Sequence, residues 1–227
     1  SWIRGTGYNE FYLKERRHPN RWDLDEAAPD HPVKLVHRSG HASVLNSLAL
    51  SLAGISLQTP EPEGGMIDRD IHSGEPNGIL YDMEEYAPLT KVTRLSSDQI
   101  EAALAQASRK YLSLGITSLQ DATPHDALGQ WEVLARLKEE GRFLPRVWKM
   151  IGSGDLEELR EEGLCFQSGT NALKIGAMKI VLMETSGALY PPASDLREQV
   201  LRAHQAGFPV ALHAVEETTV EAAIEAL

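Results

Sequence analysis

The chain has 227 residues, of which 42% are hydrophobic and 24% charged, and its formal net charge is −11. The negative charge is spread out, at −5 over residues 1–93 and −6 over residues 94–227, so no basic surface favours nucleic acid as a partner. No run approaches about 18 consecutive apolar residues, which argues against a membrane partner. Cys165 is the only cysteine, which excludes an internal disulfide and a cysteine-rich zinc module and is typical of the reducing cytoplasm.

From residue 94 onward, the sequence repeats an amphipathic helix, a glycine and a short apolar strand. Helices are expected near residues 96–114, 126–140, 155–162 and 194–206, and strands near 116–121, 146–151, 177–182 and 209–214. The strands begin about thirty residues apart, the length of one βα unit, which predicts a parallel sheet with helices outside. A doubly wound sheet and a (β/α)8 barrel both satisfy this pattern. Because no Gly-x-Gly-x-x-Gly follows a strand, the barrel is favoured.

Residues 1–93 are expected to form a mixed α/β subdomain or insertion beside a partial barrel domain of residues 94–227. Val33–His37 alternates like a strand, Ala42–Leu52 resembles a short apolar helix, and Met66–Ile71 with Gly78–Tyr81 suggests a β-hairpin. Both ends of the chain look cut, and only four βα units are visible where a complete barrel needs eight. We therefore expect a piece of a longer protein.

In a (β/α)8 barrel, functional side chains stand at the carboxyl ends of the strands. This rule selects Gln120, Asp121, Lys149, Lys179 and His213. Lys179 and His213 stand out because each interrupts an otherwise apolar strand, where an unpaired charge is costly. The structural alternatives are a lysine that extends toward the outer helices and a hydrogen-bonded core histidine.

Seven stretches occur in a fixed order along almost the whole chain: Asp25–Pro32, Val36–Ala42, Asn46–Leu50, Gly64–Asp70, Gly74–Leu80, Gly115–Ala122 and Ala211–Val215. Together they resemble the amidohydrolase superfamily, and in particular its YtcJ-like branch (amidohydrolase family 3), which includes N-substituted formamide deformylases. The resemblance implies an α/β fold, namely a partial (β/α)8 TIM barrel of the metal-dependent hydrolase type. This chain would supply barrel strands 2–5, with residues 1–93 inserted between strands 1 and 2.

The same resemblance implies the site residues. Such enzymes take metal ligands from a His-x-His on the first strand, a carboxylated lysine on the fourth, histidines on the fifth and sixth, and an aspartate on the eighth. Ile175–Ile180 looks like the fourth-strand motif, so Lys179 matches the lysine, and His213 matches the fifth-strand histidine. Both are therefore expected to be catalytic metal ligands. The other ligands and the general base have no counterpart in this chain.

Two loops and one turn bear on the substrate. Val181–Gly187 and Glu216-Glu217 stand where many relatives carry an Asp-Gly and a Gly-Asp pair, which affects substrate specificity more than the metal site. His41, in the turn Ser39-Gly40-His41, is the candidate substrate contact, and loop capping is its structural alternative.

The resemblance therefore predicts hydrolysis of an amide, formamide or related non-peptide C–N bond in a small molecule by a metal-activated water. One or two divalent ions, zinc in the first place, would bind a carbamate formed by Lys179 together with His213. A Schiff-base lyase or aldolase that uses Lys179 as nucleophile is one alternative, and a metal-free relative that binds a ligand without turnover is another. With two ligands only, we expect the isolated chain to be inactive, and its open sheet edges favour a homo-oligomer.

Overall fold

The computed structural model describes residues 1–84, 86–93 and 95–227, and the chain divides into two compact units. Unit 1 comprises Ser1–Arg94 and the short segment Glu184–Ala188, and unit 2 comprises Leu95–Met183 and Leu189–Leu227. The predicted boundary between residues 93 and 94 falls at Arg94, which lies outside the described residues.

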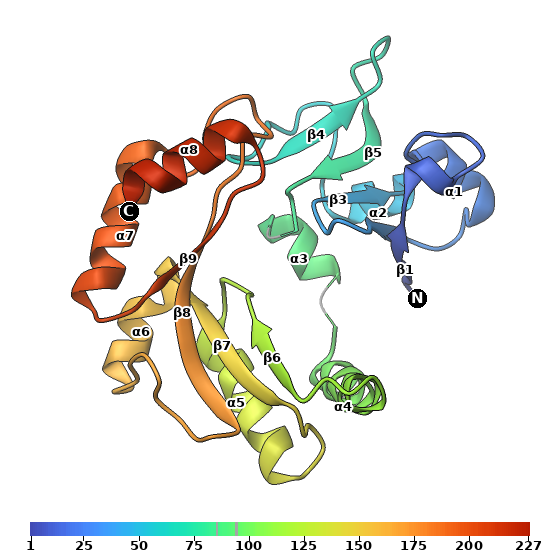
Figure 1. Ribbon diagram of the computed structural model, residues 1–227. Helices are drawn as coiled ribbons and strands as arrows, with labels where there is room; N and C mark the ends of the chain where they lie inside the picture. Colours follow the sequence, from blue (N-terminus) through green and yellow to red (C-terminus); the bar gives the residue numbers. More distant parts are fainter. Residues whose placement is uncertain (85, 94) are drawn as a thin grey trace. The chain divides into compact units, whose positions relative to one another are not determined.

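Unit 2 is built on a four-stranded parallel sheet in the order β6-β7-β8-β9 (Figure 1). Its strands are β6 (Ser118–Asp121), β7 (Arg146–Gly152), β8 (Leu173–Val181) and β9 (Val210–His213). Its helices are α4 (Ser97–Ser113), α5 (Ala127–Glu139), the 3-10 turn η2 (Ser153–Asp155) with α6 (Leu156–Glu161), α7 (Ala193–Gln205) and α8 (Glu217–Ala226). The α/β class and a parallel half-barrel sheet are confirmed, whereas the numbering of these strands as barrel strands 2–5 stays a prediction.

The sequence signals that predicted the first helix of unit 2 are present as contacts. The Ser96 hydroxyl accepts a hydrogen bond from the Gln99 backbone N–H, and the Gln99 side chain accepts one from the Ser96 N–H. This capping box satisfies donors of the first turn that would otherwise lack partners. Gly115 follows the last turn with φ of +77°, a conformation that glycine adopts without steric cost. Helix α4 therefore begins and ends where the sequence placed it.

One face of the parallel sheet is covered by helices. Ile151, Met178 and Ile180 are buried on that face, against leucines of α6 and α7. Because side chains alternate along a strand, Lys179 and its in-register neighbour Ala211 point to the opposite face. The sheet thus separates an apolar core from the face that carries the candidate site.

Unit 1 contains a five-stranded sheet in the order β1-β2-β3-β5-β4 (Figure 1). The strands are β1 (Ile3–Tyr8), β2 (Val33–His37), β3 (Ala42–Leu45), β4 (Met66–Arg69) and β5 (Pro76–Tyr81), and only the β1–β2 pair is parallel. Helix α1 (Arg21–Ala27) packs on one face, and α2 (Ser47–Leu52) and α3 (Ala87–Thr93) pack on the other. A 3-10 helix, η1 (Glu10–Tyr12), follows β1.

The strand at Val33–His37 and the hairpin of β4 and β5 are confirmed, but the prediction of one helix over Ala42–Leu52 is wrong in its first half. Ala42–Leu45 is strand β3, paired antiparallel with β2 and β5. The buried Asn46 then begins the helix, because its Oδ1 accepts hydrogen bonds from the Ala49 and Val33 N–H groups. Helices cover both faces of the sheet, so all four residues of β3 are buried and show no alternation.

Across the described ranges 1–84, 86–93 and 95–227, no helix is long and apolar enough to cross a bilayer.

Candidate functional site

Lys179 and His213 lie on the neighbouring parallel strands β8 and β9. Lys179 pairs in register with Ala211, and Val181 pairs with His213. Register partners point to the same face of a sheet, as do residues two apart along a strand. The side chains of Lys179 and His213 therefore share the face opposite to the helices, near the carboxyl ends of their strands. The structure brings together the two residues that the resemblance pairs, and their role as metal ligands stays a prediction.

A β-bulge determines the direction of Lys179. In the pairing of β7 with β8, Lys149 aligns with Ile175 but Ile151 aligns with Met178, so β8 contains one extra residue. Ile175 and Met178 are both buried against the helices even though they are three residues apart. Without the extra residue, strict alternation from Ile175 would turn Lys179 toward the helices. The bulge thus aims Lys179 at the open face.

The ammonium group of Lys179 is partly desolvated. Burial lowers the pKa of Lys179, and within the described part of the chain no neighbouring carboxylate opposes this effect. A lowered pKa increases the fraction of neutral amine, which is the form that attacks an electrophilic carbon.

The donor set for a metal ion is incomplete. Among residues 1–84, 86–93 and 95–227, no group of three or more His, Cys, Asp or Glu side chains is arranged to hold a metal ion. The imidazole of His213 and a carbamate on Lys179 are donors of the kinds that zinc and similar ions accept. These two residues fit part of a metal site, because a catalytic zinc normally takes three protein ligands.

Lys149, which the strand-end rule also selected, does not lie on the same face. It is fully buried on the helix side of β7, and its Nζ donates hydrogen bonds to Thr123 O at 2.8 Å and Met150 O at 3.0 Å. Asp121 Oδ2 lies 3.7 Å from the same Nζ. Burial lowers the pKa of Lys149, and the charge of Asp121 opposes that shift. Lys149 therefore holds the β6–α5 loop against the end of β7.

Gly152 completes this attachment of the β6–α5 loop. A Cβ atom at Gly152 would lie 1.7 Å from the carbonyl oxygen of Pro124, so only glycine permits the loop to lie so close to β7. The backbone N–H of Gly152 donates a hydrogen bond to Asp155. The loops at the carboxyl ends of β6 and β7 are therefore fixed by buried contacts.

His41 lies in unit 1, directly before β3. Its Nδ1 is 2.6 Å from Asp82 Oδ1, its side chain is 42% exposed, and its backbone N–H donates to the Ser39 hydroxyl. Loop capping accounts for the Ser39 contact but leaves the imidazole–carboxylate contact unexplained. Sequence reasoning missed Asp82 because Ala42–Leu45 was predicted as helix; a β3–β5 pairing would have placed Asp82 beside His41.

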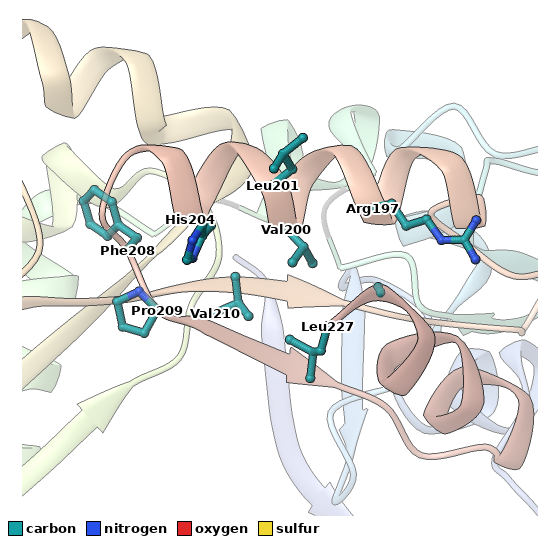
Figure 2. Close-up of a pocket in the computed structure, with 9 residues that line it drawn as sticks. Arg197, Val200, Leu201, His204, Phe208, Pro209, Val210 and Leu227 are labelled. Atoms are coloured by element: carbon teal, nitrogen blue, oxygen red, sulfur yellow. The ribbon is translucent and has the colours of Figure 1, made fainter.

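A cavity of about 410 Å3 lies beside α7, β9 and the end of α8 (Figure 2). It is lined by Arg197, Val200, Leu201, His204, Phe208, Pro209, Val210, Ala226 and Leu227. Pro209 and Val210 stand at the start of β9, whereas His213 ends that strand. This mostly apolar cavity is therefore separate from the strand ends that carry Lys179 and His213.

Comparison with known proteins gives consistent matches. The sequence matches the model described as amidohydrolase family over residues 1–227. An N-substituted formamide deformylase of Arthrobacter pascens is 28% identical over 254 residues, which cover 99% of this chain and 46% of that protein. The putative amidohydrolase YtcJ of Bacillus subtilis (strain 168) is 29% identical over 247 residues, which cover 100% of this chain and 46% of that protein.

A solved structure agrees with these sequence matches. The crystal structure of an uncharacterized metal-dependent hydrolase from Pyrococcus furiosus superposes with a TM-score of 0.63 and 26% identity, covering 99% of this chain and 48% of that one. The chain therefore spans about half the length of the curated relatives and of the solved structure that it matches.

Proposed function

The chain belongs to the amidohydrolase family, and from this premise we propose that it supplies Lys179 and His213 as two ligands of a metal-dependent hydrolase. The observation that carries the proposal is the shared face of these two side chains, near the carboxyl ends of the neighbouring strands β8 and β9. In parallel α/β folds, that end of the sheet is where catalytic groups are placed. The proposed reaction adds water to a C–N bond outside peptides and releases a carboxylic acid and an amine.

The proposed substrate is a small molecule with an amide or formamide group. The name of the Arthrobacter pascens relative, an N-substituted formamide deformylase, supports a formamide. His41 is the proposed substrate contact. The exposed Cys165 is the only cysteine, which supports a cytoplasmic location.

The chemistry proposed for Lys179 follows from its environment. Its neutral amine attacks carbon dioxide, forms one N–C bond and releases one proton, which gives an N-carboxylate anion. The partial burial that lowers the pKa of Lys179 increases the neutral amine needed for this step. The anion and the His213 imidazole would then hold a divalent ion, in the first place zinc. Such an ion, when bound, supplies a Lewis acid that polarises a carbonyl and lowers the pKa of water.

The proposal is tested on the full-length gene product by metal analysis and by labelling with 13C-bicarbonate. We expect Lys179→Met to lose the bound metal, the carbamate 13C signal and hydrolysis together. Lys174→Met is the matched control, because Lys174 stands earlier on the same strand, where its Nζ lies 5.5 Å from the ring of Trp148. Unchanged metal content in Lys179→Met would refute the ligand role.

The lowered pKa of Lys179 also favours a second function, a Schiff-base lyase or aldolase. In that reaction the neutral amine adds to a substrate carbonyl and water leaves. Borohydride would then trap a substrate adduct on Lys179, and removal of metal would leave the activity intact. Loss of activity with the metal, without a trapped adduct, would decide for the hydrolase.

A further inference from the structure

A serine, a histidine and a glutamate lie in line at the end of β2 in unit 1. His37 Nδ1 is 2.8 Å from the Ser39 hydroxyl, and His37 Nε2 is 2.9 Å from Glu10 Oε2. In this order, an imidazole can take the proton of a serine while a carboxylate orients the imidazole. Either ring nitrogen of a neutral imidazole can be the acceptor, so the serine can face Nδ1 as it does here.

A β-bulge brings Glu10 to His37. In the parallel pairing of β1 with β2, the register shifts between Thr6 and Tyr8, and Tyr8 aligns with His37. The extra residue of β1 is Gly7, whose φ of +82° is a left-handed conformation that glycine adopts without steric cost. Glu10 therefore begins η1 directly beside the end of β2.

The ring of His37 is held by packing. Its side chain is only 13% exposed, and the rings of Tyr8 and His18 contact it edge-on at centroid distances of 5.2 and 5.5 Å. The Tyr8 hydroxyl also lies 2.8 Å from His18 Nδ1, so these two rings hold each other. The two nitrogens of His37 are thus directed at Ser39 and Glu10 before any substrate binds.

The donors and acceptors around His37 suit a transfer of the Ser39 proton. The backbone N–H of Ser39 donates to His37 Nδ1 at 3.2 Å, so this nitrogen carries the lone pair and Nε2 carries the ring proton. The Ser39 hydroxyl accepts a hydrogen bond from the His41 N–H at 3.1 Å, which leaves its own proton for Nδ1. The carboxyl of Glu10 is ionised, because a hydrogen bond from its own backbone N–H holds its pKa below the usual range.

The contact between His37 and Glu10 is incomplete in the resting structure. Nε2 and Oε2 are both buried, and neither completes a hydrogen bond with any residue in the ranges 1–84, 86–93 and 95–227. A proton taken from Ser39 would give His37 a positive charge, and a small rotation would then join the two groups in a charge-assisted hydrogen bond. The interaction is therefore stronger during proton transfer than before it, which is what catalysis requires.

The simpler interpretation is structural: Ser39 caps the turn before β3, and Glu10 attaches η1 to β2. That interpretation leaves two buried polar atoms unsatisfied, which is uncommon in proteins. It also gives no role to the contact of the Ser39 hydroxyl with Nδ1. Ser39 is exposed, and a Cβ atom at the adjacent Gly40 would meet no atom within 4 Å, so a small electrophile has room beside the hydroxyl.

We propose that Ser39 is a nucleophile that hydrolyses small esters, with His37 as its general base and Glu10 as the positioning residue of His37. Ser39 Oγ gives its proton to His37 Nδ1 and bonds to the ester carbonyl carbon; the bond to the leaving alkoxide breaks, and the alkoxide takes the proton from His37. Water, deprotonated by the same nitrogen, then releases the acid and restores Ser39.

The exposure of Ser39 defines the class of ester. On an open turn, water rather than fixed donors stabilises most of the charge that develops on the carbonyl oxygen. The reaction is therefore restricted to esters with a good leaving group and a compact acyl group, and it requires no metal ion.

The nucleophile is identified in the full-length gene product with an alkyl fluorophosphonate and peptide mass spectrometry. The attacking oxygen bonds to phosphorus and fluoride leaves, so the adduct stays on the residue that reacted. We expect Ser39 to be labelled first and Ser39→Ala to remove this adduct. Ser73 is the matched control, because it is an exposed turn serine of the same unit that is bonded to Asp70 and not to a histidine. Equal labelling of Ser39 and Ser73 overturns the proposal.

The roles of His37 and Glu10 are measured by the acetylation rate of Ser39 with p-nitrophenyl acetate in metal-chelated protein, per folded molecule as counted by circular dichroism. We expect His37→Asn to lower the rate about 100-fold and Glu10→Gln about 10-fold with KM unchanged, whereas the exposed His72→Asn leaves it unaltered. A rate in His37→Asn equal to that in His72→Asn overturns the general base, and an unchanged rate in Glu10→Gln overturns the positioning role. If either variant fails to fold, labelling of Ser39 against Ser73 in the unchanged protein decides.

Discussion

The buried Lys149 offers the sharpest test of how the loops at the strand ends are held. In Lys149→Met, a side chain of similar size replaces the ammonium, so little cavity forms. The carbonyl oxygens of Thr123 and Met150 then lose their donor, at about 1–3 kcal/mol each. The removed ammonium was itself desolvated, as its lowered pKa indicates, and this offsets part of the loss. We expect a net decrease of about 2–4 kcal/mol in the unfolding free energy.

The assay for Lys149→Met is urea unfolding followed by tryptophan fluorescence. Trp131 and Trp148 lie in unit 2, and Trp148 is adjacent to the substituted residue. Lys110→Met on the exposed side of α4 is the control and should change the unfolding free energy by no more than about 0.5 kcal/mol. If Lys149→Met is as stable as this control, the two carbonyls do not depend on the ammonium and the argument is refuted.

Three further perturbations follow from the structure. Gly152→Ala should cost about 1–3 kcal/mol in urea unfolding and Gly154→Ala almost nothing, because only the first Cβ meets backbone, at Pro124. Hydrogen bonds from Arg136 and Arg142 lower the pKa of the Glu101 carboxyl to about 2. The contribution of Glu101 to the stability of the fold is therefore complete above its unfolded pKa and is lost as pH falls toward 2. Glu101→Gln should flatten this decline in acid unfolding. Asn46→Ala should cost about 2–4 kcal/mol in thermal unfolding, since four backbone groups lose their buried partner.

The helices and strands of the periodic segments were predicted well, because the signals that define them lie within a few residues of one another in the sequence. The Ser96–Gln99 capping box and Gly115 act within one helix, so their effect can be read without knowing the rest of the fold. Strand β1 and helices α1 and α3 were not predicted from the sequence. The Ala42–Leu52 error has a tertiary cause: the strand β3 is covered on both faces, which removes the alternation that marks a strand.

The site shows the same division between local and long-range information. Lys179 and His213 could be selected from their strands, because a polar residue within an apolar run is visible in the sequence. Asp82 could not, since its contact with His41 depends on the pairing of β3 with β5. Nothing in the immediate sequence of Asp82 marks this contact.

The direction of the Lys179 side chain depends on both local sequence and strand pairing. The sequence left two directions open, toward the outer helices or toward the opposite face, and a strand of uniform pleat starting at the buried Ile175 would have selected the helices. The extra residue of β8 reverses the outcome, so that Met178 takes the helix side and Lys179 the face it shares with His213. Gly176 lies inside this bulge, where a Cβ atom would come within 3.3 Å of Lys149 O. The direction of Lys179, the proposed metal ligand, therefore depends on this irregularity, and a substitution that straightened β8 would turn Lys179 toward the helices.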